Sequence, residues 1–191
     1  MTLPPSCRWT GHHLELLDQR QLPGAVAFMQ LQAWQEVAEA IKSMAVRGAP
    51  AIGIAAAWGV VLAARVGDDL PSAIKGLRAS RPTAVNLGWA LDRMQAAISS
   101  SGSGDVEALA ALADAIQNED RRLTQRLVDH GVSLLTQGCR VLHHCHTGAI
   151  ATGGVGTALG VIASAHARGV LRHAWLDETR PRLQGAALSG W

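Results

Sequence analysis

The sequence of 191 residues is long enough for one full domain or two small ones with a sizeable apolar core. Hydrophobic residues make up 48% and charged residues 17%, which excludes intrinsic disorder, and a net charge of +2 gives no reason to expect nucleic acid or a membrane surface as a partner. The first six residues show no basic segment followed by an apolar core, so no secretory signal is expected and the cytoplasm is the predicted compartment.

The first half of the chain is predicted to be mainly helical. Residues 15–30 mix short apolar pairs with Pro23-Gly24, which indicates a strand-like or irregular segment with a turn. Trp34 to Met44 repeats apolar positions at helical spacing, and a new helix is predicted from Pro50, a residue suited to a first helical position. That helix contains the apolar run Ala49 to Ala64, which is shorter than the roughly 20 residues that span a bilayer, so we expect it to be buried.

Two further helices are expected after this run. Pro82 is predicted to begin an amphipathic helix that continues to about Ile98. The small and polar residues Ser99 to Gly104 are typical of a loop. A long helix then runs from about Asp105 to Gln137, and Gly138 is a plausible terminator for it.

The character of the sequence changes near residue 135. A short β-like run, Arg140 to Cys145, is followed by a glycine-rich turn, a helix from about Gly154 to Arg168 and a second strand, His173 to Asp177. This is one βαβ unit, so the fold class is α/β. Because two parallel strands and one helix do not make a stable doubly wound sheet, we predict a helical domain over 1–135 followed by the first, incomplete part of a parallel-sheet domain over 136–191, and we expect the sequence to be a fragment.

Cys145 is the first candidate for chemistry. It lies at the predicted carboxyl end of a strand, just before a glycine-rich turn, where open α/β sheets present their active groups. The positive end of the following helix would stabilise its thiolate and make the thiol a usable base or nucleophile. A buried, inert cysteine is the alternative interpretation. The other cysteines, Cys7 and Cys139, form no CxxC pair with it, so we expect reduced thiols.

Three histidines next to Cys145 raise the question of a metal site, since imidazole and thiolate are common zinc ligands. Strand alternation would send His144 and His146 to one face and His143 with Cys145 to the other, so the four side chains would not converge. We therefore predict no metal.

Glycines at 148, 153, 154, 156 and 160 would allow a ligand to approach the backbone, and amides at the start of the next helix could hold phosphate. This predicts a phosphorylated small molecule. Gly154-x-Gly156-x-x-x-Gly160, with Asp177 or Glu178 about 20 residues on, also resembles a variant dinucleotide fingerprint. Against it, the glycines begin several residues after the strand, and the intervening His-Cys-His-Thr has no role in holding a dinucleotide.

Two arginines are candidates for an anion site. Arg47 and Arg81 each lie close before a proline that is predicted to begin a helix, which pairs a guanidinium with exposed helix amides. A solvated arginine is the alternative for either one. The polar loop Asp177 to Gly185 follows the second strand, again at the functional end of an α/β sheet, although it could be only surface.

Four segments carry a resemblance to a known family. They are Val46 to Gly53, Ser80 to Leu87, His144 to Thr157 and Asp177 to Leu188, and together they are similar to the signature segments of methylthioribose-1-phosphate isomerases. The resemblance implies an amino-terminal helical domain, a carboxy-terminal Rossmann-like domain, a homodimer and a cytoplasmic step of methionine salvage. It places this chain at the amino-terminal part of such an enzyme.

The resemblance also implies a reaction and a set of site residues. The family converts 5-methylthioribose 1-phosphate into 5-methylthioribulose 1-phosphate without a cofactor, and the phosphate on C1 obstructs ordinary enediol chemistry because no free aldehyde forms. By resemblance Cys145 is the catalytic thiol. The implied substrate contacts are Arg47, Gly48, Ala49, Arg81 and Gln184. A second catalytic group, an aspartate, is expected in a segment beyond Trp191, so this chain is expected to be an incomplete catalyst.

One departure and two alternatives accompany the resemblance. His146 stands where we expect asparagine, which changes the hydrogen bonding beside the thiol. The same fold family includes non-catalytic regulatory subunits of translation initiation factor 2B and isomerases of other pentose phosphates. Cys145 within His-Cys-x-Thr-Gly, with intact Arg-Gly-Ala and Ser-Arg-Pro-Thr segments, favours an isomerase.

Overall fold

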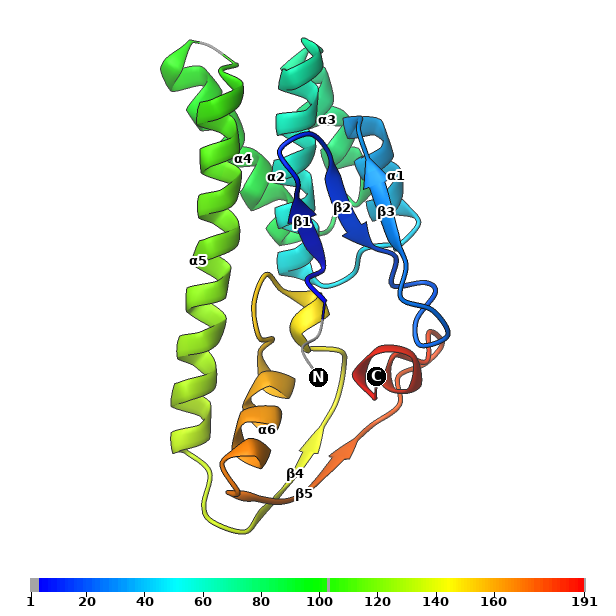
Figure 1. Ribbon diagram of the computed structural model, residues 1–191, viewed down its shortest axis with the longest axis vertical. Coiled ribbons are helices and arrows are strands. Elements are labelled where there is room, and N and C mark those ends of the chain that lie inside the picture. The colour runs from blue at the N-terminus through cyan, green and yellow to red at the C-terminus, as the bar shows by residue number, and fades with distance from the viewer. Residues whose placement is uncertain (1–3, 103, 191) are drawn as a thin grey trace.

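The computed structural model describes residues 4–102 and 104–190 and shows an elongated molecule of helices and two small sheets (Figure 1). Its elements are β1 (Cys7–Trp9), β2 (Leu14–Leu17), β3 (Phe28–Leu31), α1 (Trp34–Lys42), α2 (Ala49–Val66), α3 (Leu70–Ser80), α4 (Val85–Ser101), α5 (Val106–Ser133), β4 (Cys139–His143), the 3₁₀ turn η1 (Ala149–Ala151), α6 (Ala158–Ala167), β5 (Leu171–Leu176) and the π-helical turn η2 (Gly185–Ser189). The α/β fold class is confirmed.

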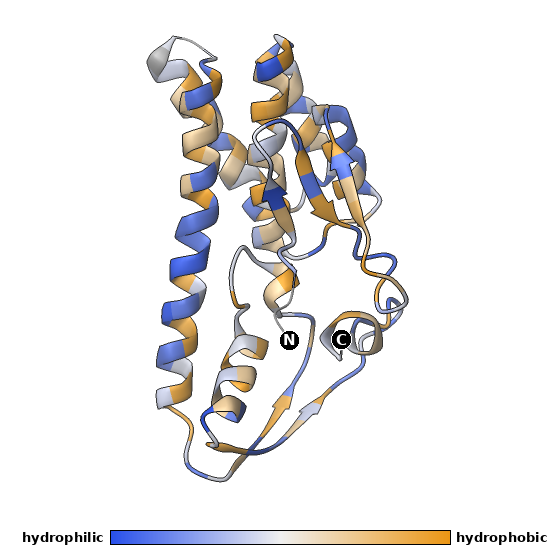
Figure 2. Cartoon of the chain, in the orientation of Figure 1, coloured by the Kyte–Doolittle hydropathy of each residue, from blue (hydrophilic) through white to orange (hydrophobic). Residues whose placement is uncertain are grey.

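Helix α2 is the centre of the core. All but one of its residues, Arg65, are apolar, as the turns visible in Figure 2 illustrate, and a helix of that kind must be covered by other elements. Although α2 is long and apolar enough to span a bilayer, 72% of it is buried inside the protein, which confirms the predicted buried helix. Close packing depends on its glycines, since a Cβ on Gly53 would lie 2.8 Å from the carbonyl oxygen of Asn86 in α4.

A three-stranded antiparallel sheet, ordered β1-β2-β3, packs against the helices. Its inward residues, Cys7, Leu14, Leu16 and Leu31, are buried in the same core as α2. The strand-like character predicted for residues 15–30 is confirmed by β2 and β3, whereas β1 was not predicted. Three residues are too few to establish an alternating pattern.

The prediction that Pro82 begins a helix is wrong. Helix α3, which was not predicted, ends at Ser80 with Arg81 as its C-cap, and α4 begins only at Val85. The sequence signal for α3 was Asp69-Leu70-Pro71, because the Asp69 carboxylate accepts a hydrogen bond from the amide of Ser72 and Pro71 lies in the first turn. The predicted loop from Ser99 is also displaced, since α4 continues to Ser101 and ends at Gly102 in the left-handed conformation.

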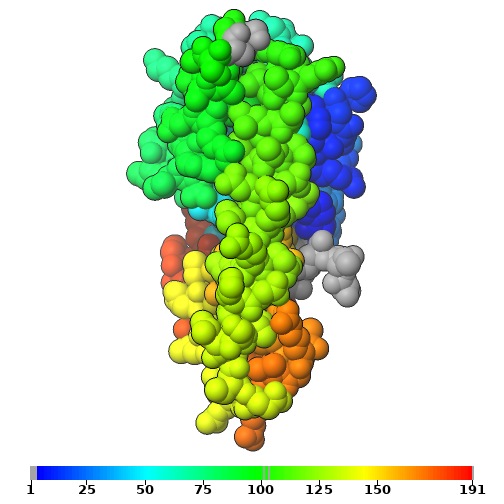
Figure 3. All heavy atoms as spheres, turned by 90° about the vertical axis from the view of Figure 1, so that its left-hand side faces the viewer, coloured from blue at the N-terminus to red at the C-terminus, as the bar shows by residue number. Residues whose placement is uncertain are grey.

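Helix α5 runs the length of the molecule and contacts both of its parts (Figure 3). Its first half packs on α2 and α4, and its last turns pack on α6, where Val128, Val132 and Ala165 form a small core of their own. A Cβ on Gly131 would lie 2.5 Å from Val161 of α6, so the two helices are in close contact. The helix ends at Ser133, a few residues before the predicted end.

The predicted βαβ unit is confirmed. Strands β4 and β5 are parallel, with Leu142 opposite Trp175, and α6 connects them. Two boundaries differ from the prediction: β4 ends at His143 instead of Cys145, and α6 begins at Ala158 instead of Gly154. In the stretch before α6 the chain forms η1 and a glycine-rich loop that packs on α5.

Candidate functional site

Cys145 lies in the turn just beyond the end of β4. Its thiol is exposed, and its φ of +79° is a left-handed conformation that is uncommon for residues other than glycine and concentrates at functional sites. Because the strand has already ended, the alternation argument used for His144, Cys145 and His146 was wrong. Among the residues that the structure describes, no group of three or more His, Cys, Asp or Glu side chains is placed to hold a metal ion.

The segment before α2 is pressed against η1. Gly48 has a φ of +96°, and a Cβ there would lie 2.3 Å from the carbonyl oxygen of Ala151, so only glycine fits. The buried side chain of Gln19 joins the two segments, since its Nε2 donates to the carbonyl oxygens of Ile150 (2.8 Å) and Arg47 (3.4 Å). The chain around Arg47 is thereby held beside the turn that follows Cys145.

The start of α2 has no side-chain cap. Its N-cap is Gly48, and Pro50 lies in its first turn as predicted. The positive end of a helix macrodipole and the first amides of the helix, among them that of Ala49, therefore have no capping side chain to compensate them. Such an end is suited to an anion.

Two more arginines lie near Arg47, which directly precedes Gly48 at this helix start. Burial and the positive charges of Arg182 and Arg81 lower the pKa of Arg47, while the charge of a Cys145 thiolate raises it, so each of these three side chains lies within electrostatic range of the Arg47 guanidinium. None of the three guanidinium groups has a hydrogen bond or an ion pair with another part of the described chain. Unpaired like charges held together are the electrostatic signature of an anion site.

The loop after β5 is anchored to the same region. The Glu178 carboxylate accepts hydrogen bonds from the amides of Gly185 (2.7 Å) and Ala186 (2.9 Å), and these bonds lower the pKa of Glu178. Gln184 accepts a hydrogen bond from the Thr179 hydroxyl at 2.9 Å. At the end of the loop, Leu188 of η2 is buried in a small cluster with Leu17, Leu22 and Ile150. The loop that contains Arg182 is therefore attached to η1, which packs against the segment before α2.

The backbone amides of Gly153, Gly154 and Gly156 in the glycine-rich turn donate hydrogen bonds within the protein. The amide of Gly153 donates to the Asp120 carboxylate at 2.6 Å, and the amides of Gly154 and Gly156 both donate to the Thr152 hydroxyl at 3.2 Å. A Cβ on Gly154 would lie 2.4 Å from the Thr124 hydroxyl of α5. These glycines therefore permit close packing within the chain, and neither a phosphate nor a dinucleotide finds free amides among them.

His146, which follows Cys145, is one of the buried polar residues in this region. It is 9% exposed, its Nδ1 lies 3.4 Å from the Ser189 hydroxyl oxygen, and its Nε2 is buried without a hydrogen-bond partner in the described chain. Burial, followed by the positive charges of Arg47 and His143, lowers the pKa of His146 to about 4. The imidazole is therefore neutral at neutral pH.

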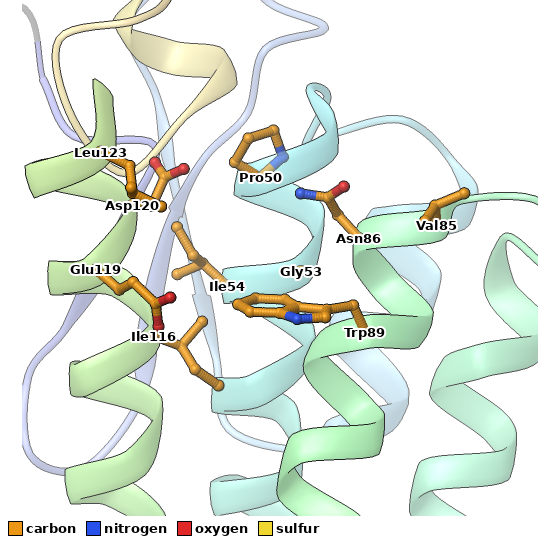
Figure 4. A pocket seen from close by; sticks show the side chains of 10 residues that line it. All are labelled: Pro50, Gly53, Ile54, Val85, Asn86, Trp89, Ile116, Glu119, Asp120 and Leu123. Atoms are coloured by element: carbon orange, nitrogen blue, oxygen red, sulfur yellow. The ribbon is translucent and has the colours of Figure 1, made fainter. Parts of the chain in front are cut away.

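A separate cavity of about 300 Å³ opens between α2, α4 and α5 (Figure 4). The indole of Trp89 lies on one side of it, and the Glu119 and Asp120 carboxylates lie on the other. Burial raises the pKa of Asp120. Because the cavity is lined by apolar groups and carboxylates, it suits neither a phosphate nor thiol chemistry, and we place the candidate site at Cys145 and the arginines instead.

The structure thus brings Arg47, Arg81 and Cys145 into one region, with Gly48 and Ala49 at the start of α2. It places Gln184 in the loop after β5, hydrogen bonded to Thr179. Sequence reasoning missed Arg182. The available signal was its position in the polar loop after the second strand, where we had selected only Gln184.

Comparison with known proteins identifies relatives of the chain. Residues 45–191 match the model of the initiation factor 2 subunit family. The chain is 84% identical over 191 residues to the methylthioribose-1-phosphate isomerase of Synechococcus sp. (strain CC9605), which covers 100% of this chain and 57% of the relative. It is 50% identical over 192 residues to that of Alkalilimnicola ehrlichii, with 96% of this chain and 56% of the relative covered. The resemblance described from the sequence is confirmed.

Solved structures agree with these relatives. The 5-methylthioribose 1-phosphate isomerase from Pyrococcus horikoshii OT3 superposes with a TM-score of 0.91 at 36% identity, covering 100% of this chain and 57% of that one. The delta subunit of translation initiation factor eIF-2B from A. fulgidus superposes with a TM-score of 0.83, also at 36% identity, covering 99% and 58%. The chain therefore spans between half and two thirds of the length of these proteins.

Proposed function

The chain belongs to the initiation factor 2 subunit family, and from this premise we propose that it carries the anion-binding and thiol-bearing part of an isomerase that converts 5-methylthioribose 1-phosphate into 5-methylthioribulose 1-phosphate. The named relatives that are 84% and 50% identical support this substrate. The reaction moves hydrogen within one molecule, so it requires no redox cofactor. It is a step of methionine salvage.

The observation that carries the proposal is the unpaired arginine group beside an exposed thiol. A phosphate dianion would offset two of the three positive charges of Arg47, Arg81 and Arg182, which have no carboxylate partner in the described chain. Arginine binds phosphate through paired N–H donors, and the uncapped start of α2 adds amides and a favourable dipole. Phosphate bound there brings a sugar carbon chain next to Cys145.

Each residue of the site then has a role in the proposed reaction. Arg47, Arg81 and the backbone of Gly48 and Ala49 hold the phosphate on C1. Gln184 contacts the sugar from the loop after β5. The Cys145 thiol transfers a proton at the carbon that is oxidised, and an aspartate supplied from elsewhere in the protein is the second proton-transfer group.

The wider organisation of the protein is part of the same proposal. Residues 1–135 form a helical domain, and residues 136–191 form the first part of a Rossmann-like domain. Parallel sheets are normally covered on both faces, yet Leu142 and Trp175 on adjacent strands are 71% and 49% exposed. Further structure of the protein is therefore expected to cover this face. The active form is proposed to be a cytoplasmic homodimer.

The test is conversion of 5-methylthioribose 1-phosphate by the protein purified at its natural length, followed by nuclear magnetic resonance of substrate and product. Cys145→Ala should lower kcat by roughly 10²- to 10⁴-fold, because general acid–base catalysis contributes factors of that size. Cys139→Ala is the matched control, since this thiol lies at the far end of β4. Turnover by Cys145→Ala within a few fold of the unmodified protein would refute the role of the thiol.

Similarity to the delta subunit from A. fulgidus favours one alternative, a binding protein without catalysis. Under that alternative the anion site would bind a phosphorylated ligand that remains unchanged. The same resonance experiment separates the two functions, because saturable binding of 5-methylthioribose 1-phosphate without any product would support the binding protein.

A further inference from the structure

His146 is a buried side chain beside the exposed thiol of Cys145. It follows Cys145 directly and is 9% exposed, and its ring is held from two sides. Nδ1 lies 3.4 Å from the Ser189 hydroxyl oxygen of η2, and Cε1 lies 3.7 Å from the position of a Cβ on Gly148. The imidazole therefore connects the turn of the thiol with the loop that follows β5.

The second ring nitrogen has no partner. Nε2 is one of three buried side-chain polar atoms without a hydrogen bond in the described chain, together with Oε1 of Gln19 and Nε2 of His13. Leaving such an atom unpaired costs about 1–3 kcal/mol, so each case requires an explanation. Two of the three lie around Arg47, since Gln19 also donates to its carbonyl oxygen. Unpaired polar atoms therefore gather where the arginines do.

The chemistry of a neutral imidazole narrows the class of ligand. One ring nitrogen is a donor and the other is an acceptor, and the Ser189 hydroxyl can pair with Nδ1 in either role. Nε2 is then left as an acceptor or as a donor, according to the tautomer. A hydroxyl group is suited to both cases because it can donate as well as accept. A carboxylate or a second phosphate only accepts hydrogen bonds, so it would pair with Nε2 only in the tautomer in which Nε2 is the donor.

We propose that His146 is a substrate-binding residue whose Nε2 pairs with a hydroxyl group of the sugar while the arginines hold the phosphate. This assignment rests on the proposed function. It gives the site a contact to a sugar hydroxyl in addition to its contacts with the phosphate. Histidine would thereby make a contact that the asparagine expected from the family resemblance is too short to make. The low pKa of His146 agrees with this role, because the ring remains neutral beside Arg47.

Two substitutions of His146 test the contributions of its two ring nitrogens separately. In His146→Asn the amide can reach Ser189 in place of Nδ1 but is too short to replace Nε2, whereas in His146→Gln the longer side chain places its amide nitrogen near the Nε2 position. His13→Asn is the matched control, because Nε2 of His13 also has no hydrogen-bond partner in the described chain, although it lies 3.8 Å from the Glu15 carboxylate, and His13 directly precedes β2 in the β1–β2 turn, far from η2 (Figure 1). All variants are made in the protein at its natural length.

The experiment compares the binding of 5-methylthioribose 1-phosphate with that of inorganic phosphate, by calorimetric titration of each variant. His146→Asn should weaken sugar phosphate binding by roughly three- to tenfold, the value of one hydrogen bond, and leave phosphate binding unchanged. His146→Gln should recover most of the loss, and His13→Asn should change neither affinity. The KM of His146→Asn should rise more than its kcat falls.

Two outcomes would overturn the assignment. Equal affinity of His146→Asn and the unmodified protein for the sugar phosphate would mean that Nε2 faces only a trapped water. Equal weakening of both ligands would mean that His146 merely supports the site. Failure of the proposed function would be seen in a different measurement, because the unmodified protein would then form no 5-methylthioribulose 1-phosphate. That result does not depend on how His146 changes the affinities for the sugar phosphate and for inorganic phosphate.

Discussion

Two helices begin close to Cys145, and their first turns differ in a way that locates the anion site. Helix α6 is capped by Thr147, whose hydroxyl accepts from the amide of Leu159 at 2.9 Å and whose carbonyl accepts from that of Thr157 at 2.8 Å. Helix α2 begins at Gly48 without a cap and lies beside three unpaired arginines. A helix start becomes a ligand site only when the chain leaves its amides unused.

Gly48→Ala should have the largest effect of four changes that test this difference. The new Cβ would lie 2.3 Å from the Ala151 carbonyl oxygen at a φ of +96°, so the free energy of unfolding should fall by about 2–4 kcal/mol. Gly67→Ala is the control, because Gly67 has a φ of +72° with no atom near its Cβ position and should cost only about 1 kcal/mol. Equal losses in urea denaturation would show that α2 and η1 are not in close contact.

Arg47→Ala should have the next largest effect. Loss of a charged hydrogen-bond donor should weaken inorganic phosphate binding by about 1.5–3 kcal/mol in calorimetric titrations. Arg180→Ala is the matched control, since Arg180 lies in the same loop as Arg182 but acts on Glu178. If Arg180→Ala weakened phosphate binding as much as Arg47→Ala, the general charge of this surface would be responsible instead of a site at α2.

The third test is the dependence of stability on pH. The pKa of His146 falls from 6.5 in the unfolded chain to about 4 in the folded protein, so the unfolded chain takes up the proton first as pH decreases. The contribution of the neutral ring is complete above pH 6.5 and is lost as pH falls toward 4. Unfolding free energies measured through this window should decrease by about 1–2 kcal/mol more for the unmodified protein than for His146→Gln. Parallel curves would contradict the low pKa.

Thr147→Val should have the smallest effect, a loss of about 1 kcal/mol of stability, because it removes the hydroxyl that accepts from the amide of Leu159 in α6 and lies 3.2 Å from Nε2 of His143, and it leaves the arginines untouched. Thr147→Ser keeps the hydroxyl and should retain the stability. Phosphate affinity should be the same in both variants. If Thr147→Val lost as much phosphate affinity as Arg47→Ala, the anion would bind at the start of α6 and not at the start of α2.

Much of this arrangement was predictable from residues that act locally. The apolar run from Ala49 with Pro50 in its first turn, the βαβ unit and Cys145 beyond a strand all follow from patterns within a few positions. The reason given for choosing Arg81 was wrong, since Arg81 caps the end of α3 and does not precede a helix at Pro82.

What could not be predicted depends on contacts between distant segments. Arg182 joins Arg47 because Leu188 packs with Leu17 and Ile150, which no local pattern shows. The partner of His146 Nδ1 is Ser189, 43 positions away in the sequence. Gly153 and Gly154 are needed for packing because Asp120 and Thr124 of α5 lie where side chains at these positions would have to be.

The length of α5 has a mechanical consequence. At 1.5 Å per residue its 28 residues form a rod of about 40 Å that is packed on α2 at one end and on α6 at the other. The two parts of the molecule cannot rotate about each other unless this rod bends, so the site between them is not a hinge. Ligand exchange must then use the short segments at the edge of the site, above all the loop from Asp177 to Ser189, which carries Arg182, while Arg47 remains in place beside the start of α2.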